Sequence, residues 1–292
     1  MTATDPMVTV ITATWNLIDA GRADLVRGAA ESLFSQTFRD MEWLIQDGAS
    51  TDGTVDLLQD LVDHAPADLS ARLISEPDQG LYDAMNRAVA AARGRYVLFL
   101  NSDDTFFGPD SLALLAAAVN DTEADFAYGQ VEIAQPETHD VSIWKADLFR
   151  FLRTMPFGHN AALYRRSMFL ELDGFDLSYK SAADYDFICR MIADGYRGRA
   201  ISETVYRFLL GGHSAEEARD SHESSTLLRN IYARWVQASG VTDDIVLSWM
   251  KRRYLPPLFC LRIAVSPNAN TFVRRTALWE FYRASKRVLG LK

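Results

Sequence analysis

The chain has 292 residues, a formal net charge of −9, 48% hydrophobic and 24% charged residues. These values are typical of one large globular domain or of a domain with an appendage, and no apolar run is long enough to suggest a membrane-spanning helix. We expect no signal peptide, because no basic segment precedes an apolar stretch at the N-terminus. Two distant cysteines, Cys189 and Cys260, lack metal-ligand spacing and indicate a reducing cytoplasm.

Strands and helices are expected to alternate over the first hundred residues, which predicts an α/β fold with a Rossmann-like, mostly parallel sheet flanked by helices. The strands are expected at residues 7–16, 41–48, 71–77 and 95–100, and the helices at 25–36, 52–64 and 81–92.

The pattern changes after Asp104. A helix is expected at 111–120, a strand pair or kinked strand at 126–134, a strand, short helix and turn over 160–176, a helix at 181–198 and a strand at 205–210. From residue 215 onward the sequence predicts helices, interrupted at Pro256-Pro257.

Polar side chains follow every early strand: Thr14 and Asn16, Asp47, Asp78, then Asn101 and Asp103. Parallel sheets bind ligands outside the carboxyl ends of their strands. One shared site on this edge of the sheet explains the polar clusters more simply than several unrelated turns.

The segment NSDD (101–104) places two adjacent carboxylates at the end of a buried strand. A solvated turn would explain the segment alone, because Asn, Ser and Asp favour turns. Together with the other polar strand ends, it favours a site for Mg2+ or Mn2+, which prefer carboxylates and substrate phosphates.

Two further motifs leave alternatives open. QDGASTDGT (46–54) is either a Gly-rich turn with a helix cap or a place where Asp47 accepts a hydrogen bond from a base. EPDQGLYDAMN (76–86) is either a helix-capping arrangement around Asp78 or a contact with a donor molecule.

The motifs TATWN, DGASTDGT, EPDQGLYDAMN and FLNSDD stand in the order and spacing of the family 2 glycosyltransferases, which the chain resembles over about its first two-thirds. That family has the GT-A fold. The resemblance implies a GT-A domain over residues 1–214, with a nucleotide-sugar half to about 110 and an acceptor half over about 111–214. Residues 215–292 would form a helical, basic extension.

The resemblance also implies roles for the donor half. Thr14 and Asn16 would line the nucleotide, and Asp47 would meet its base, typically uracil. Asp78 and Asn86 would contact the donor.

The NSD segment occupies the place of the family's Asp-x-Asp motif. Asp103 would bind the metal that bridges the donor phosphates, and Asn101 would face the ribose or sugar. An Asn replaces the first acid of that motif.

In the acceptor half, Asp184 matches the general base of an inverting enzyme, with Asp186 as the alternative. Ala183 stands where the family usually has a Glu that contacts the acceptor. His213 would complete the metal site, or is an exposed loop residue. His159 would face the donor sugar, or is a buried histidine at a strand start.

The resemblance thus implies a metal-dependent, inverting glycosyltransferase of hexosyltransferase type. It would transfer one sugar from a nucleotide sugar, with UDP as the expected nucleotide, to a glycan or lipid-linked glycan in polysaccharide biosynthesis. Ile231 replaces the Gln of the Gln-x-x-Arg-Trp motif of processive synthases. The alternatives are a nucleotidyltransferase, which would need a basic Gly-rich loop after the first strand, and an inactive nucleotide-sugar-binding protein.

Charge is uneven along the chain: residues 245–292 contain ten Lys or Arg and one acid, Glu280. The acidic remainder argues against a nucleic-acid partner. In the last expected helix, one side gathers apolar residues and another gathers cations: Leu278, Phe281, Tyr282, Val288 and Leu289 against Arg275, Arg283, Lys286 and Arg287. This pattern suits peripheral contact with an anionic membrane at the inner face of the cell, packing on the acidic body, or a homodimer contact.

Overall fold

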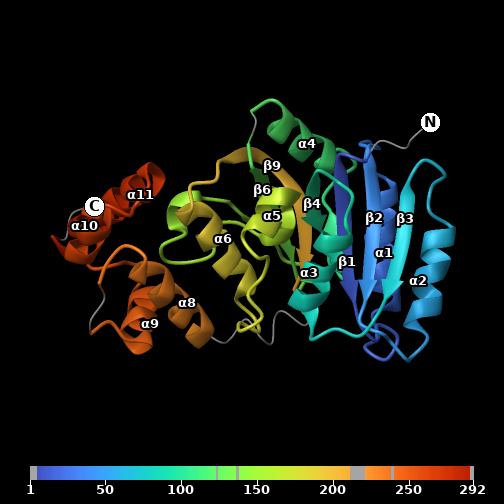
Figure 1. The fold of residues 1–292 in the computed structure, drawn as a ribbon, viewed down its shortest axis with the longest axis horizontal. Coiled ribbons are helices and arrows are strands. Elements are labelled where there is room, and N and C mark those ends of the chain that lie inside the picture. The colour runs from blue at the N-terminus through green and yellow to red at the C-terminus, as the bar shows by residue number, and fades with distance from the viewer. Residues whose placement is uncertain (1–4, 123, 136–137, 211–220, 238–239, 290–292) are drawn as a thin grey trace. The chain divides into compact units, whose positions relative to one another are not determined.

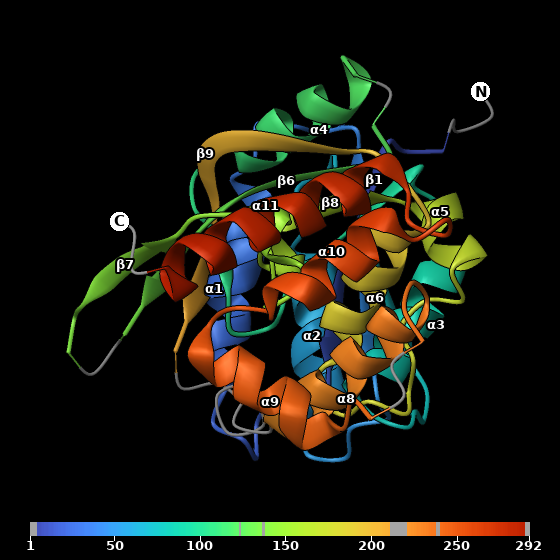
Figure 2. The same cartoon turned by 90° about the vertical axis from the view of Figure 1, so that its left-hand side faces the viewer.

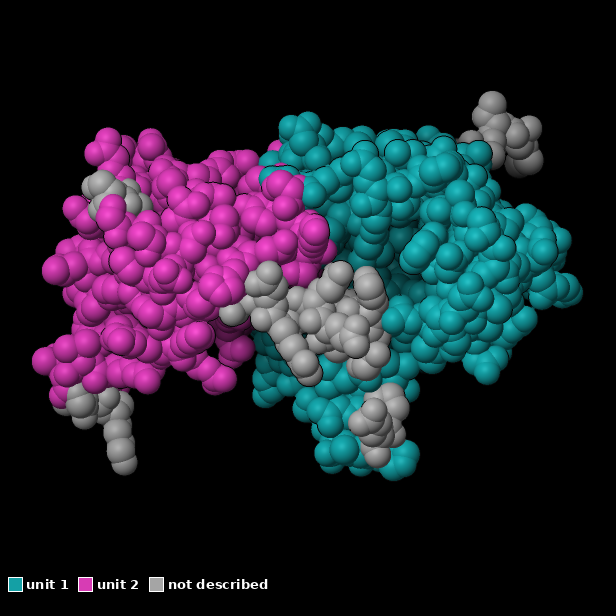
Figure 3. All heavy atoms as spheres, turned by 90° about the horizontal axis from the view of Figure 1, so that it is seen from below, with its two compact units in different colours: residues 1–146, 157–177, 198–212 teal, residues 147–156, 178–197, 213–292 magenta. Residues whose placement is uncertain are grey.

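The computed structural model describes residues 5–122, 124–135, 138–210, 221–237 and 240–289. The chain divides into two compact units (Figure 3). The first comprises residues 1–146, 157–177 and 198–212, and the second comprises residues 147–156, 178–197 and 213–292. The domain boundary after residue 214 stays a prediction.

The first unit contains four parallel strands in the order β3-β2-β1-β4 (Figure 1). They are β1 (Val8–Thr14), β2 (Met41–Asp47), β3 (Ser70–Ser75) and β4 (Tyr96–Phe99). The connecting helices are α1 (Ala23–Phe34), α2 (Thr54–Asp63) and α3 (Leu81–Ala91). The predicted alternation of strands and helices is confirmed, with boundaries that differ by a few residues.

The same sheet continues from β4 through strands of mixed direction, in the order β8-β6-β9-β5, with β7 paired to β6. These are β5 (Thr105–Phe106), β6 (Phe126–Ala134), β7 (Val141–Trp144), β8 (Ala162–Arg165) and β9 (Gly198–Leu209). The helices here are α4 (Ser111–Asn120) and α5 (Arg166–Glu171), with the 3-10 turn η2 (His159–Ala161) before β8.

Strand β6 is a single kinked strand, one of the two predicted alternatives. Its register with β9 shifts on both sides of Gln130. At the adjacent Gly129, an added Cβ would lie 2.6 Å from Cγ2 of Val205. The close approach of the two strands therefore requires glycine at this position.

Alternating side chains of the central strands form the core of the first unit. Val8 and Val10, and likewise Leu98 and Leu100, join one buried cluster with residues of α1, α2 and α4. Each fully buried aliphatic side chain contributes roughly 1.5–3 kcal/mol, so this core fixes the strand ends that carry the polar residues.

The second unit consists mainly of helices. They are η1 (Leu148–Arg150), α6 (Ala183–Ala193), α8 (Ser221–Ala233), α9 (Asp243–Arg252), α10 (Pro257–Val265) and α11 (Thr271–Val288). The predicted helical C-terminus and its interruption before Pro257 are confirmed. Helices α10 and α11 lie side by side (Figure 2). Within the described residues, no helix has both the length and the apolar character needed to cross a bilayer.

Asn270 joins two of these helices. Its Oδ1 accepts a hydrogen bond from the N–H of Val273, which caps the start of α11. Its Nδ2 donates to the carbonyl oxygens of Ile192 (2.9 Å) and Ala193 (3.0 Å) at the end of α6. One side chain therefore satisfies unpaired backbone groups at both helix termini.

Candidate functional site

The buried carboxylate of Asp47 connects the ends of three strands. Its Oδ1 accepts hydrogen bonds from Oγ1 of Thr14 (3.2 Å) and Oγ of Ser50 (2.5 Å). Its Oδ2 accepts from the N–H of Ser50 (2.9 Å) and Oγ of Ser75 (2.7 Å). The strand ends thus meet as predicted. Because a carboxylate offers about four acceptor positions, a base could contact Asp47 only by replacing one of these donors, and that role stays a prediction.

Asn16 ties the loop after β1 to the loop after β2. Its φ of 44° lies in the left-handed region, which Asn tolerates better than most residues. Its N–H donates to Oγ of Ser50 (2.8 Å), and its Oδ1 accepts from the N–H of Thr51 (3.1 Å). Among the described residues Nδ2 of Asn16 has no hydrogen-bond partner, so this group remains for a ligand.

Trp15 is exposed beside the strand ends, with 67% of its surface accessible. A Cβ added at Gly48 would lie 2.8 Å from Oδ2 of Asp78 and 3.2 Å from Cδ1 of Trp15, so these three residues are in close proximity. Burial raises the pKa of the Asp78 carboxyl, although it accepts the N–H of Gly80 (2.8 Å). An exposed indole in this place can stack on a flat base.

The two carboxylates of the NSDD segment lie in different environments. Asp104 is buried, and its Oδ2 accepts from Nδ2 of Asn101 (3.1 Å), Nδ2 of Asn160 (3.2 Å) and Oη of Tyr206 (3.1 Å). Its Oδ1 accepts from the N–H of Leu209 (3.1 Å). Asp104 therefore holds the turn after β4 against the end of β9.

Asp103 and Asp104 also differ in their electrostatic surroundings. Burial, followed by the nearby charge of Asp103, raises the pKa of Asp104 to about 7, even though four donors favour its ionised form. Asp103 is only partly buried, and its Oδ2 lies 3.7 Å from Nη1 of Arg22. The accessible charge in this segment therefore belongs to Asp103.

The donor set suits a cation held largely by its substrate. Within the described part of the chain, no three His, Cys, Asp or Glu side chains cluster as a metal site. Asp103 supplies one accessible carboxylate, and a Mg2+ or Mn2+ ion needs only one or two when a diphosphate provides further oxygens. His213, the other predicted ligand, lies outside the described residues.

Two predicted donor residues have structural contacts. The amide of Asn86 donates from Nδ2 to the carbonyl of Phe175 (2.9 Å), and its Oδ1 accepts the N–H of Phe175 (2.8 Å). His159 is partly buried, and its ring lies 6.0 Å from that of Phe99 and 6.2 Å from that of Phe175. Both roles toward a donor stay predictions.

In the second unit, Asp184 lies in the first turn of α6 and is partly buried. Its Oδ1 accepts the N–H of Tyr185 (2.8 Å). The alternative base, Asp186, is buried and forms an ion pair with Arg190 (2.6 Å). Asp184 is therefore the more accessible carboxylate of the two.

Glu223 of α8 orders the chain just before α6. It accepts from the N–H of Lys180 (2.9 Å), and from the N–H and Oγ of Ser181 (2.8 and 2.9 Å). Burial raises the pKa of Glu223, but these donors outweigh burial and leave its pKa below the ordinary value. This contact supports the first turn that carries Asp184.

Sequence reasoning assigned no role to Trp15, Tyr206 or Glu223, and it grouped Asp104 with Asp103 as carboxylates of a metal site, whereas Asp104 is buried and hydrogen-bonded. Trp15 stands within the motif TATWN, so the sequence could have indicated an aromatic side chain at the end of the first strand as a candidate ligand contact. The roles of Asp104 and Tyr206 depend on contacts between residues 102 positions apart, and the sequence carries no such signal.

A family model described as Glycosyl transferase family 2 matches residues 9–191, more than half of the chain. The chain belongs to glycosyl transferase family 2. This match covers the strand ends with Thr14, Asp47 and Asp103, and it extends into α6. The resemblance inferred from the motifs is confirmed, and the protein is a glycosyltransferase.

Named relatives agree with this family. A PGL/p-HBAD biosynthesis glycosyltransferase of Mycobacterium tuberculosis is 35% identical over 192 residues, which are 65% of this chain and 71% of that protein. The chondroitin synthase of Pasteurella multocida is 25% identical over 211 residues, which are 71% of this chain and 21% of that protein.

Solved structures show the same fold. S. aureus TarS in complex with UDP-GlcNAc has a TM-score of 0.61 at 17% identity, over 97% of this chain and 92% of that chain. The mannosyltransferase PcManGT from Pyrobaculum calidifontis, with GDP-Man and Mn2+, has a TM-score of 0.60 at 20% identity, over 97% of this chain and 76% of that chain. The GT-A fold of this family 2 glycosyltransferase is therefore confirmed.

Proposed function

We propose that this glycosyltransferase is metal-dependent and inverting, and that it transfers one sugar from a UDP-sugar to a glycan or lipid-linked glycan in polysaccharide biosynthesis. The proposal rests mainly on the different surroundings of Asp103 and Asp104. Asp104 is fixed by four hydrogen bonds, while Asp103 keeps an accessible carboxylate at the strand ends. A Mg2+ or Mn2+ ion needs only one or two protein carboxylates when a diphosphate supplies further oxygens, so this arrangement supports the proposal.

The chain's own groups would bind the donor from several loops. Trp15 would stack on the base, and Nδ2 of Asn16 would donate to the nucleotide. Arg22, at 3.7 Å from Asp103, would exchange this carboxylate for a donor phosphate. A divalent cation at Asp103, when bound, would neutralise charge on the departing diphosphate.

Asp184 would act as the general base. The acceptor oxygen forms a bond to the anomeric carbon, the bond from that carbon to the diphosphate oxygen breaks, and the acceptor proton moves to the Asp184 carboxylate. Asp184 is only partly buried whereas Asp186 is buried, and this difference in accessibility supports the assignment of Asp184 over Asp186. Glu223 would keep the first turn of α6 in place.

A donor screen tests the proposal. The protein is incubated with UDP-, GDP- and dTDP-sugars, with Mn2+ or with chelator, and the released nucleotide is identified. We expect UDP to be released only with a metal ion. Release of pyrophosphate from a parallel mixture of UTP and a sugar 1-phosphate would instead indicate a nucleotidyltransferase, and binding without turnover of any donor would indicate an inactive binding protein.

We also propose that residues 245–292 contact an anionic membrane. Helices α10 and α11 lie side by side (Figure 2). Several of their apolar side chains are exposed, among them Leu258 (75%), Val265 (69%), Leu278 and Tyr282. The same segment carries ten cations. Exposed apolar residues mixed with cations are suited to an anionic membrane surface.

A further inference from the structure

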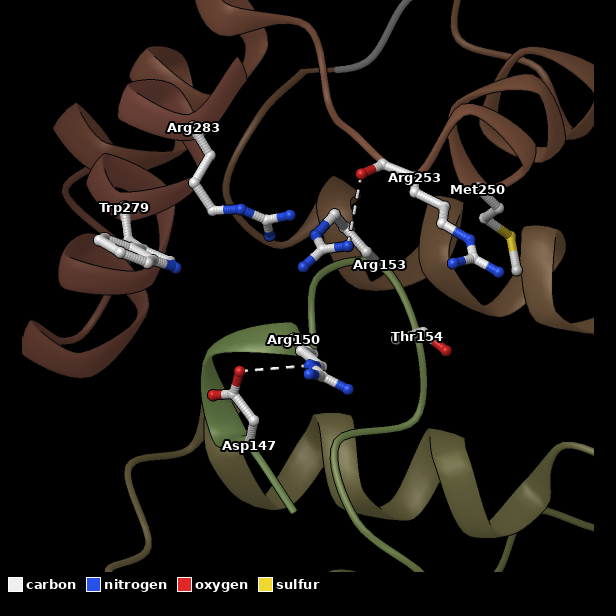
Figure 4. Close-up of a pocket in the computed structure, with 8 residues that line it drawn as sticks. All are labelled: Asp147, Arg150, Arg153, Thr154, Met250, Arg253, Trp279 and Arg283. Carbon is white, nitrogen blue, oxygen red and sulfur yellow. Dashed lines mark hydrogen bonds and ion pairs between the residues drawn. The ribbon is translucent and has the colours of Figure 1, made fainter. Parts of the chain in front are cut away.

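The second unit contains a cavity of about 580 Å³ that is rich in arginine (Figure 4). Four guanidinium groups line it, together with the ring of Trp279. Arg150 comes from η1, Arg153 from the loop after it, Arg253 from the end of α9 and Arg283 from α11. Three separate segments of the chain thus bring like charges to one space, although like charges repel.

The carboxylates nearby do not balance these cations. Arg150 pairs with Asp147 (3.2 Å). Arg153 and Arg283 share one buried carboxylate, Glu280, at 2.8 and 3.1 Å. For the guanidinium of Arg253, no ion pair or hydrogen bond occurs within the described residues. Four cations therefore face two acids, and a formal excess of two positive charges remains.

Arg253 is also in a backbone conformation that favours glycine. It follows the last turn of α9 with φ 58° and ψ 32°, the left-handed region, where glycine is the usual residue. An arginine is less stable there than a glycine would be. Strained residues of this kind are concentrated at functional sites, and this one lines the cavity.

We propose that this cavity binds a phosphate or diphosphate ester. Guanidinium groups match phosphate oxygens with paired hydrogen bonds, and the excess of two charges matches a phosphate dianion. The volume lies in the range of small-molecule sites and leaves room for an organic group. Trp279, 47% exposed, offers that group an apolar face. The site uses residues of the second unit alone and does not depend on the proposed donor chemistry.

Calorimetric titration of the full chain with inorganic pyrophosphate and with glycerol 3-phosphate tests the proposal. We expect binding that weakens with salt, and an affinity reduced about tenfold or more in Arg253→Gly and in Arg150→Gln. Arg253→Gly should melt at the same or a higher temperature, because glycine suits this backbone position. Arg199→Gln is the matched control, since it removes one exposed cation from β9, outside both the cavity and the basic segment 245–292; its affinity should stay within about twofold.

Vesicles distinguish the source of the phosphate. Binding of soluble pyrophosphate that Arg253→Gly abolishes supports a free or acceptor-borne phosphate. Binding only to vesicles that contain phosphatidylglycerol, again lost in Arg253→Gly and retained in Arg199→Gln, supports a lipid headgroup. The proposal is overturned if neither probe binds, or if the control variant loses as much affinity as the cavity variants, since unspecific charge would then explain the binding.

Discussion

Asp103 and Asp104 are adjacent in the chain, yet Asp104 is buried under four hydrogen bonds while Asp103 lies at the strand ends, 3.7 Å from Arg22. A pair of like charges is therefore not presented to one ligand. The buried acid holds the turn in shape, and the accessible acid is left for chemistry. The same substitution at the two positions should have different consequences.

Asp104→Asn should lower the free energy of unfolding by roughly 1–3 kcal/mol, because its amide nitrogen would replace one acceptor oxygen and face either the N–H of Leu209 or the hydroxyl of Tyr206 and its neighbouring donors. Urea unfolding measures this change. Asp121→Asn makes the same chemical change at an exposed residue after α4 and should stay within about 0.5 kcal/mol of wild type. Equal stability of Asp104→Asn and Asp121→Asn would show that the four hydrogen bonds do not hold the turn.

Local sequence patterns were sufficient for the first half of the fold. The alternation of strand and helix predicted the parallel strands, and polar residues at each strand end predicted that Thr14 and Asp47 would meet. Each of these patterns lies within a short segment of neighbouring residues, so it can be recognised in the sequence without knowledge of the tertiary contacts.

Contacts between distant segments were not predictable. Asn86 pairs with Phe175, 89 positions later, and Asp104 accepts from Leu209, 105 positions later. β5 has only two residues and exists because it pairs with β9. Such features depend on tertiary packing, which overrides local preference.

Asp184→Asn should reduce turnover by about 10²–10⁴-fold, the usual contribution of a general base, and should leave UDP binding unchanged. Turnover is measured as UDP release with an accepted acceptor. Asp186→Asn should mainly lower stability, because it breaks the ion pair with Arg190. If Asp186→Asn lost turnover at normal stability while Asp184→Asn kept it, the assignment of the base would be wrong.

Glu223→Gln should destabilise the protein at pH 7 by roughly 1–2 kcal/mol, because ionised Glu223 is the better acceptor for the N–H groups of Lys180 and Ser181. The folded-state pKa lies below the ordinary value of 4.5, so this stabilisation is present above pH 4.5 and is lost as pH falls through the folded-state pKa. Unfolding of both forms at several pH values should show the difference closing in acid. A difference that is independent of pH would contradict the role of the charge.

Full-length protein should cosediment with phosphatidylglycerol vesicles at low salt and be released by salt. Leu258→Glu and Val265→Glu each replace an exposed apolar residue of α10 and should reduce the bound fraction. Val141→Glu, at an exposed position of β7, is the matched control and should bind as wild type does. If the α10 variants bound vesicles as well as wild type does, the membrane proposal would be contradicted. Packing on the acidic body or a homodimer contact would then explain the basic residues of 245–292.

Titration of UDP into wild type and Asp103→Asn, each with Mn2+ and with chelator, tests the central claim most directly. The account predicts that Mn2+ strengthens UDP binding by wild type, that chelator removes this gain, and that Asp103→Asn binds UDP weakly and equally under both conditions. The exposed Asp121→Asn should behave as wild type does. A wild-type affinity that is the same with Mn2+ and with chelator, or a full Mn2+ effect in Asp103→Asn, would contradict the assignment of Asp103 to a metal-bound donor diphosphate.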